Sequence, residues 1–167
     1  EYIVILAGDH VYKMDYGLML AEHVERGADL SIACIDMPVE AASSFGVARV
    51  DEQGRLQEFV EKPMAWSRIP GKRACALVSM GIYVFNAESL YGQLVRDARC
   101  AESTHDFAMD IIPRLLREGG RVYAHRFSNS CVNMVGGHPY WRDVGTVDAY
   151  WEANMDLTRV QPELNMY

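Results

Sequence analysis

The chain has 167 residues, half of them hydrophobic, so it has enough apolar material to bury one domain-sized core and is not expected to be disordered. Its formal net charge of -7 argues against nucleic acid or an anionic membrane surface as the main partner, although local cations and a metal can still favour a small anionic substrate in one cleft. Four widely spaced cysteines without a Cys-x-x-Cys pair fit reduced thiols, and no run is long enough to span a membrane, so we expect a soluble, cytoplasmic protein.

The first stretch, residues 2–10, is an apolar run that ends in Gly8, Asp9 and His10. It is rich in β-branched residues and lacks polar alternation, which predicts a central strand covered on both faces. Asp9 then lies at the carboxyl end of that strand, where open α/β sheets bind ligands and where a carboxylate can hold a hard cation. From this stretch alone, Asp9 could equally begin a turn or cap the following helix.

The next segments predict a strand–helix–strand unit. Residues 15–26 have helical spacing of apolar side chains, and Gly27 is a suitable C-terminal stop. Residues 29–37 read as a second strand that Pro38 ends. The sheet is therefore expected to be at least partly parallel.

A β-hairpin is predicted over residues 45–62, with the polar turn at residues 51–54. Pro63 ends its second strand, and the sequence through residue 73 reads as a loop. Residues 76–85 form a further strand that contains Gly81, and a glycine inside a strand often marks a close approach of backbone or ligand.

The second half of the chain predicts helices over residues 87–98 and 106–116, the latter interrupted at Pro113, and a strand over residues 121–127. A polar loop follows, and Thr146 is expected to cap a last helix that runs from residue 147 to about residue 159. Because the chain begins with Glu1 and enters an apolar strand at once, we interpret it as a piece of a longer protein.

Five segments, in order and with compatible spacing, resemble those of the sugar-1-phosphate nucleotidylyltransferases, and most of all the bacterial subfamily that makes ADP-glucose. They are Leu6-Ala7-Gly8-Asp9-His10 with Tyr12-Lys13-Met14-Asp15-Tyr16, the hairpin ending in Phe59-Val60-Glu61-Lys62-Pro63, Ser79-Met80-Gly81-Ile82-Tyr83-Val84-Phe85, His105-Asp106-Phe107 with Asp110-Ile111-Ile112-Pro113, and Tyr140-Trp141-Arg142-Asp143-Val144-Gly145-Thr146. The resemblance runs nearly end to end.

The resemblance implies an α/β, Rossmann-like nucleotidyltransferase fold, similar to glycosyltransferase A, with a mixed sheet flanked by helices and incomplete at the N-terminus. Residues 1–160 would be the C-terminal part of the catalytic domain, and residues 161–167 the start of a linker to a β-helix domain. The implied activity is transfer of the adenylyl group of ATP to glucose 1-phosphate, giving ADP-glucose for glycogen synthesis and pyrophosphate. In such a reaction the protein mainly has to position the two substrates and neutralise the charge of their phosphates.

The resemblance also implies roles for individual residues. Asp9 and Asp143 would be catalytic carboxylates that hold Mg²⁺, the implied cofactor, and Lys62 would grip the sugar phosphate. Read alone, Asp143 is a solvated turn residue before a helix, and its Trp-Arg-Asp-Val-Gly-Thr context is what favours the metal role. The sugar pocket would add Glu61, which accepts hydrogen bonds from hydroxyl groups, together with Gly46, Ser79 and Tyr83.

Three further residues attract less support. His10 and His105 lack the His-x-x-x-His spacing of a zinc site. The adjacent pair His105-Asp106 is a weak candidate for a catalytic dyad, because neighbours in sequence rarely face one another. We therefore interpret both histidines and Trp141 as packing residues or as residues that support the site.

Two departures and several alternatives accompany the resemblance. Ala108 stands where the subfamily usually has glycine, and the Gly-rich loop that binds the nucleoside triphosphate does not occur in these residues, so the chain resembles the sugar-phosphate and metal half of a catalytic domain that is inactive alone. The alternatives are a transferase that uses UTP or dTTP, a non-catalytic regulatory subunit, and a fragment that neither binds nor catalyses. The family implies ATP and glucose 1-phosphate as partners, no nucleic acid or membrane, allosteric control by metabolites, and a homotetramer.

Overall fold

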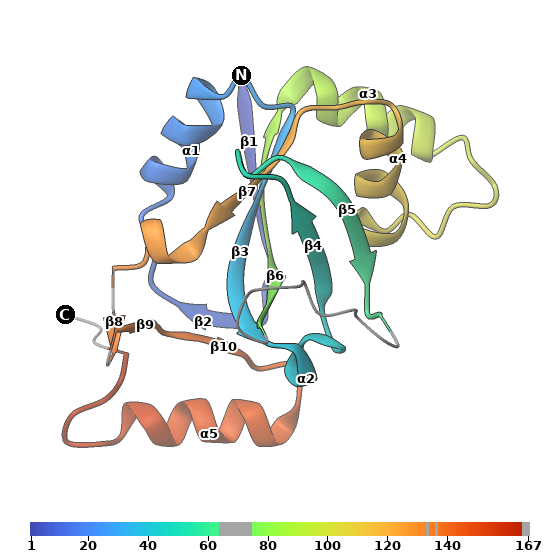
Figure 1. The fold of residues 1–167 in the computed structure, drawn as a ribbon. Coiled ribbons are helices and arrows are strands. Elements are labelled where there is room, and N and C mark those ends of the chain that lie inside the picture. Colours follow the sequence, from blue (N-terminus) through green and yellow to red (C-terminus); the bar gives the residue numbers. More distant parts are fainter. Residues whose placement is uncertain (64–74, 133, 136, 165–167) are drawn as a thin grey trace.

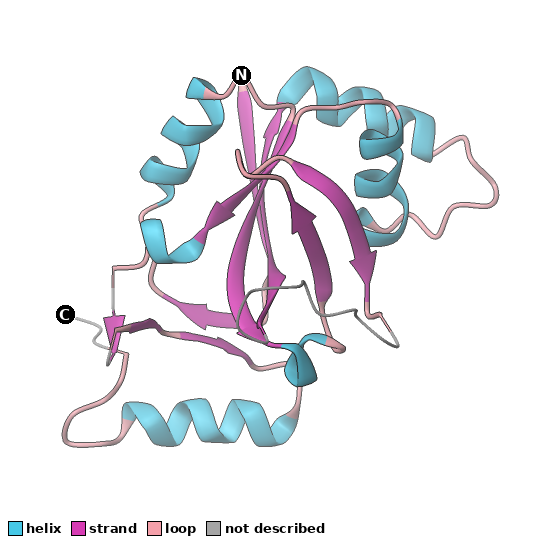
Figure 2. Ribbon diagram, viewed as in Figure 1, coloured by secondary structure: helices cyan, strands magenta, loops and turns pink. Residues whose placement is uncertain are grey.

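A computed structural model describes residues 1–63, 75–132, 134–135 and 137–164. Its centre is a six-stranded mixed sheet in the order β5 (Leu56–Glu61), β4 (Gly46–Val50), β6 (Cys75–Asn86), β3 (Leu30–Pro38) and β7 (Val122–Arg126), with β1 (Tyr2–Leu6) also paired to β6. Only β3 and β7 pair in parallel; the remaining pairs in this sheet are antiparallel. The expected α/β fold with a mixed sheet flanked by helices is confirmed (Figures 1 and 2).

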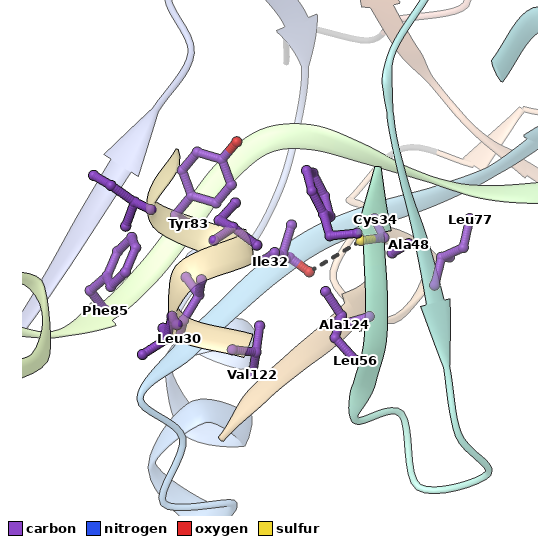
Figure 3. Close-up of a cluster of buried hydrophobic side chains, with 14 of the residues drawn as sticks. Leu30, Ile32, Cys34, Ala48, Leu56, Leu77, Tyr83, Phe85, Val122 and Ala124 are labelled. Atoms are coloured by element: carbon purple, nitrogen blue, oxygen red, sulfur yellow. Dashed lines mark hydrogen bonds between the residues drawn. The ribbon is translucent and has the colours of Figure 1, made fainter. Parts of the chain in front are cut away.

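The long strand β6 organises this sheet because it pairs with β3 along one edge and with β4 and β1 along the other. Most of its side chains are buried, and they contribute to three apolar clusters among the described residues. The larger cluster packs Leu30, Ile32 and Phe85 against the side of α3 (Ala87–Asp97) and α4 (Ile112–Arg117) (Figure 3). Met19 of α1 (Tyr16–Glu25) belongs to a second cluster.

Local signals in the sequence correspond well to the observed ends of elements. The Asp15 carboxylate accepts a hydrogen bond from the Gly17 amide at 2.8 Å and begins α1, and Gly27 follows the helix with a φ of +55°. Thr146 caps α5 (Val147–Leu157) by accepting from the Ala149 amide at 3.2 Å. The hairpin, the strand at residues 76–85 and the helix at residues 87–98 are also confirmed.

The first strand differs from the prediction of a central strand covered on both faces. β1 ends at Leu6, pairs only with β6 among the described strands, and leaves Tyr2, Val4 and Leu6 more than 40% exposed. Strands β1 and β3 do run in the same direction, as expected for the strand–helix–strand unit, but β6 lies between them. A hydrophobic run thus identified the strand correctly, whereas its burial depends on neighbours that a local pattern does not specify.

Smaller elements complete the described chain. A helical turn α2 (Val39–Ala42) follows β3, a π-helical turn (Phe107–Ile111) leads into α4, and a 3₁₀ turn (Phe127–Asn129) follows β7. Where a polar loop was expected, short strands β8 (Met134–Val135) and β9 (His138–Pro139) pair antiparallel. The loop predicted up to residue 73 lies outside the described residues from residue 64 on. Within the described part of the chain, no helix has the length and apolar character needed to cross a bilayer.

Candidate active site

A cleft of about 490 Å³ opens between the main sheet and a small two-stranded sheet. The seven residues to which the family resemblance assigned a catalytic, metal or sugar-binding role all line it: Asp9, Gly46, Glu61, Lys62, Ser79, Tyr83 and Asp143. They come from segments that are distant in sequence. The fold therefore brings the predicted residues together, although their individual roles stay predictions.

The small sheet brings the two candidate metal carboxylates side by side. Strands β2 (His10–Tyr12) and β10 (Trp141–Asp143) lie side by side (Figure 1) and pair antiparallel. In this pairing Asp143 is opposite His10. The Val144 amide donates a hydrogen bond to the Asp9 carbonyl oxygen at 2.9 Å, which ties the two segments together just beyond the strands.

The ligand atoms of Asp9, His10 and Asp143 all lie within 4.8 Å of one another. The Gly145 amide donates to Asp143 Oδ1 at 2.9 Å, so that side chain is oriented by the turn that precedes α5. Two carboxylates at the mouth of a cleft, with room for phosphate oxygens and water, match the donor set that Mg²⁺ prefers. The residues present therefore fit a magnesium ion.

Glu61 and Lys62 end the hairpin at the same cleft. Lys62 has a φ of +44°, a left-handed conformation that is uncommon for a residue other than glycine, and its amide donates to the Phe45 carbonyl at 3.1 Å. The Lys62 ammonium is 3.8 Å from Glu61 Oε1, and its side chain is 68% exposed. Burial raises the pKa of the Glu61 carboxyl group and nearby Asp106 raises it further, while the Lys62 charge opposes both.

Gly46 leaves the space in which the Glu61 carboxylate lies. A Cβ atom at this position would be 2.5 Å from Phe59 Cζ and 2.8 Å from Glu61 Oε2, both closer than packed atoms approach. A side chain at position 46 would therefore displace the Glu61 carboxylate or the Phe59 ring.

Ser79, Gly81 and Tyr83 line the floor of the cleft on β6. The Ser79 hydroxyl accepts from the Gly81 amide at 3.2 Å, and Gly81 has a φ of +65°. The Gly81 carbonyl accepts from the Ala7 amide at 3.1 Å, and a Cβ on Gly81 would be 3.1 Å from Ala7 Cβ. The predicted close approach at this glycine is thus confirmed, and it brings the segment before Asp9 against β6.

The Tyr83 ring is buried and stacks on Phe107 with ring centroids 5.7 Å apart. Burial raises the pKa of the Tyr83 phenol to about 12, so the side chain stays neutral at physiological pH. It offers the cleft a rigid wall with a hydroxyl group.

The cleft also contains residues to which the sequence assigned no role, including Ser44, Asp106, Phe107 and Ala108. The Asp106 carboxylate accepts from the amides of Ala108 and Met109 at 2.7 and 2.8 Å and begins the π-helical turn. An aspartate directly before a helical run is the local signal that could have identified this cap.

The histidines behave differently from one another. His105 lies outside the cleft, where its Nδ1 is 2.7 Å from Asp97 Oδ2, so it forms no dyad with Asp106. His10 lines the cleft, with its ring edge-on to Trp141 at 5.1 Å. Trp141 is buried, as expected for a packing residue.

Comparison with known proteins identifies the family of this chain. Residues 1–160 match the family model described as nucleotidyl transferase. The chain is 63% identical over 166 residues to glucose-1-phosphate adenylyltransferase of Nitrosomonas europaea, covering 99% of this chain and 38% of the relative. Proteins of the same name from Nitrosospira multiformis and Methylobacillus flagellatus are 58% and 60% identical, over all of this chain and 39% of each relative.

The chain thus spans about two fifths of the length of these relatives. The family match covers nearly all of its residues, including the hairpin, β6 and the two candidate metal carboxylates, Asp9 and Asp143. The chain belongs to the nucleotidyl transferase family.

Proposed function

We propose that this chain forms the sugar-phosphate and metal-binding part of a glucose-1-phosphate adenylyltransferase, which makes ADP-glucose for glycogen synthesis. The observation that carries the proposal is the cleft in which Asp9 and Asp143 share one opening with Glu61 and Lys62. Relatives of 58–63% identity that carry this name support the choice of substrate.

In this reaction a phosphate oxygen of glucose 1-phosphate attacks the α-phosphorus of ATP, and the bond from that phosphorus to the bridging oxygen of pyrophosphate breaks. Two anions must approach each other, so the main task of the protein is to neutralise and align them. Lys62 supplies a positive charge on a flexible stem that reaches into solvent at the cleft. No covalent intermediate with the protein is needed.

The two aspartates would hold Mg²⁺, which when bound supplies further neutralisation of the phosphate oxygens. Their backbone connections keep Asp9 and Asp143 at fixed positions, because the Val144 and Gly145 amides bond to the Asp9 carbonyl and the Asp143 carboxylate. Glu61 accepts hydrogen bonds from sugar hydroxyls, and Gly46 leaves the space for its carboxylate.

Calorimetric titration of glucose 1-phosphate into the chain, with and without Mg²⁺, tests the sugar-phosphate part. We expect saturable binding that Lys62→Ala weakens about tenfold or more, as for a lost charge-assisted hydrogen bond. Arg49→Ala is the matched control, because Arg49 is exposed on β4, pairs with Glu58 at 3.0 Å and does not line the cleft. Equal binding by Lys62→Ala and wild type would refute the role of Lys62.

Catalysis is tested in a chimera in which this chain replaces the matching segment of the Nitrosomonas europaea relative. We expect ADP-glucose formation from ATP and glucose 1-phosphate, and a loss of more than about a hundredfold in kcat for Asp143→Asn. Asp148→Asn, in the first turn of α5, is the matched control. A folded chimera without activity would favour the non-catalytic regulatory subunit.

For the whole protein we further propose a homotetramer in the cytoplasm, under allosteric control by metabolites. The four cysteines are all free thiols, which supports a reducing compartment. Sedimentation analysis of the full-length protein tests the assembly, and activity measured with and without phosphorylated sugar metabolites tests the control.

A further inference from the structure

We propose that His10 is a third metal ligand beside Asp9 and Asp143, and that its imidazole shifts the preference of this site from Mg²⁺ toward transition-metal ions such as Co²⁺ and Mn²⁺. The inference rests on the proposed function, because it assumes a metal ion between the two carboxylates. It adds a ligand and a metal preference that the two aspartates alone do not provide.

The positions of the atoms support coordination by His10. The three side chains offer ligand atoms that all lie within 4.8 Å of one another. His10 Nε2 is 3.6 Å from Asp9 Oδ1, which is too long for a hydrogen bond. It is close to the separation of two neighbouring ligand atoms on one ion with bonds of about 2.0–2.3 Å.

Packing holds the ring in this orientation. The His10 side chain is only 11% exposed, and its ring lies edge-on to Trp141 at an interplanar angle of 74°. The ring also lies beside Gly81, where an added Cβ atom would be 3.4 Å from His10 Cε1. Nδ1 is buried and has no hydrogen-bond partner among the described residues. Apolar neighbours therefore fix the ring, and Nε2 is the nitrogen that approaches the carboxylates.

The backbone adds a second constraint on the three ligands. His10 and Asp143 are directly opposite each other in the β2–β10 pair, and Asp9 precedes His10. A change in register of this pair would separate the ligands. The donor set is therefore built into the small sheet.

The chemistry of the donor set predicts a measurable preference. Mg²⁺ favours oxygen ligands, whereas an imidazole nitrogen raises affinity along the series Mn²⁺, Fe²⁺, Co²⁺ and Ni²⁺. Two carboxylates without a nitrogen ligand would discriminate less between Co²⁺ and Mg²⁺. His10 should therefore contribute little to Mg²⁺ affinity and much to Co²⁺ affinity.

Electron spin-echo envelope modulation of the 167-residue chain with Mn²⁺ alone tests the ligand directly. We expect ¹⁴N modulation typical of a coordinated imidazole, lost in His10→Asn and retained in His138→Asn, which changes an exposed histidine of the β9 strand. Mn²⁺ that binds in an Asp143-dependent manner without nitrogen modulation would overturn the role of His10 and leave the proposed function intact. Absence of any saturable Mn²⁺ binding would overturn the metal site itself.

Calorimetry with Co²⁺ and with Mg²⁺ provides a second readout. We expect His10→Gln to lower Co²⁺ affinity about tenfold or more and Mg²⁺ affinity less than about threefold. Circular dichroism establishes that the variant is folded. An equal loss for both ions in a folded variant would mean that His10 only packs beside the aspartates, and would refute coordination.

Discussion

The Glu61 side chain is 23% exposed at the end of β5, and burial raises the pKa of its carboxyl group. The native state therefore holds this proton more tightly than the unfolded state does. The free energy of unfolding should fall as pH rises from the ordinary carboxyl range through the raised pKa, and the cost of the buried charge is fully present above the raised pKa. The same charge is what would accept hydrogen bonds from a sugar.

We expect Glu61→Gln to be more resistant to urea than wild type at pH 7 and equally resistant near about pH 3, where the carboxyl group is protonated in both states. Affinity for glucose 1-phosphate should fall about tenfold or more. Urea midpoints and calorimetry measure the two effects. Glu58→Gln, on the same strand but outside the cleft, should leave sugar binding unchanged. A less stable Glu61→Gln at pH 7 would contradict the burial argument.

Gly46 offers a test of close packing at the sugar pocket. A Cβ at this position meets the Phe59 ring and the Glu61 carboxylate inside contact distance, so Gly46→Ala should lower the free energy of unfolding by about 1–3 kcal/mol and weaken glucose 1-phosphate binding. Gly92→Ala is the matched control, because Gly92 is exposed on α3 and a Cβ atom there would meet no atom within 4 Å apart from the adjacent backbone of its own helix. That change should stabilise the chain by about 0.5–1 kcal/mol. Equal urea midpoints for the two variants would exclude the clash.

At the scale of elements, local signals were sufficient for most of the main sheet and its helices. The turn at residues 51–54 predicted the hairpin, and the spacing of apolar side chains over residues 15–26, followed by Gly27, predicted α1. The pairing of β2 with β10 was not predicted, because strands of three residues from distant parts of the chain show no periodicity. The exposure of β1 was missed for a related reason, since burial is set by what packs against a strand.

Some features of the candidate site could likewise be predicted from the sequence, and others required the fold. Resemblance to a family identified Asp9, Asp143, Glu61 and Lys62, and the cleft contains all of them. Only the fold reveals that the β2–β10 register brings His10 beside the two aspartates. Residues that become neighbours through the pairing of distant strands can be predicted from the sequence only when they belong to a known family motif.

The contact between α1 and β3 contains a buried histidine that should make stability depend on pH. His23 Nδ1 lies 2.9 Å from Ser31 Oγ, Nε2 has no hydrogen-bond partner among the described residues, and burial lowers the pKa of the ring, while Asp29 opposes that shift. The pKa of His23 is lower in the native state than in the unfolded state. The neutral ring therefore contributes to the free energy of unfolding above the ordinary histidine pKa, and this contribution is lost as pH falls through the lowered pKa.

We expect the free energy of unfolding to decrease as pH falls below about 6.5, and His23→Gln to flatten this decrease. Urea titrations at several pH values measure it. His138→Gln, which changes an exposed histidine, should retain the wild-type dependence. An unchanged slope in His23→Gln would assign the pH dependence to another group.

At the scale of the whole molecule, the cleft lies where two sheets meet. Glu61 and Lys62 approach it from the main sheet, whereas His10 and Asp143 approach it from the β2–β10 pair. Gly81 and Ala7 connect the two parts through a backbone hydrogen bond. The sugar and metal parts of the proposed site therefore depend on one another for their relative position, and a change at this junction should affect both.

The outer edge of the main sheet determines how the chain behaves in isolation. β1 pairs only with β6 among the described strands, and Tyr2, Val4 and Leu6 expose apolar surface along it. Unpaired backbone groups beside apolar side chains favour pairing with another chain. We expect the apparent mass of the 167-residue chain in sedimentation velocity to rise as its concentration is raised, and Val4→Lys to suppress this rise.

The control for this prediction is a second exposed valine on a different element. Val147, at the start of α5, is 84% exposed, so Val147→Lys adds the same charge and removes a similar apolar side chain without touching the sheet edge. If strand pairing drives association, only Val4→Lys should restore a concentration-independent mass, because lysine on an edge strand opposes pairing directly. Suppression by Val147→Lys alone would assign the association to the exposed apolar side chains of α5, Val147, Tyr150 and Trp151, and would refute pairing through the β1 edge.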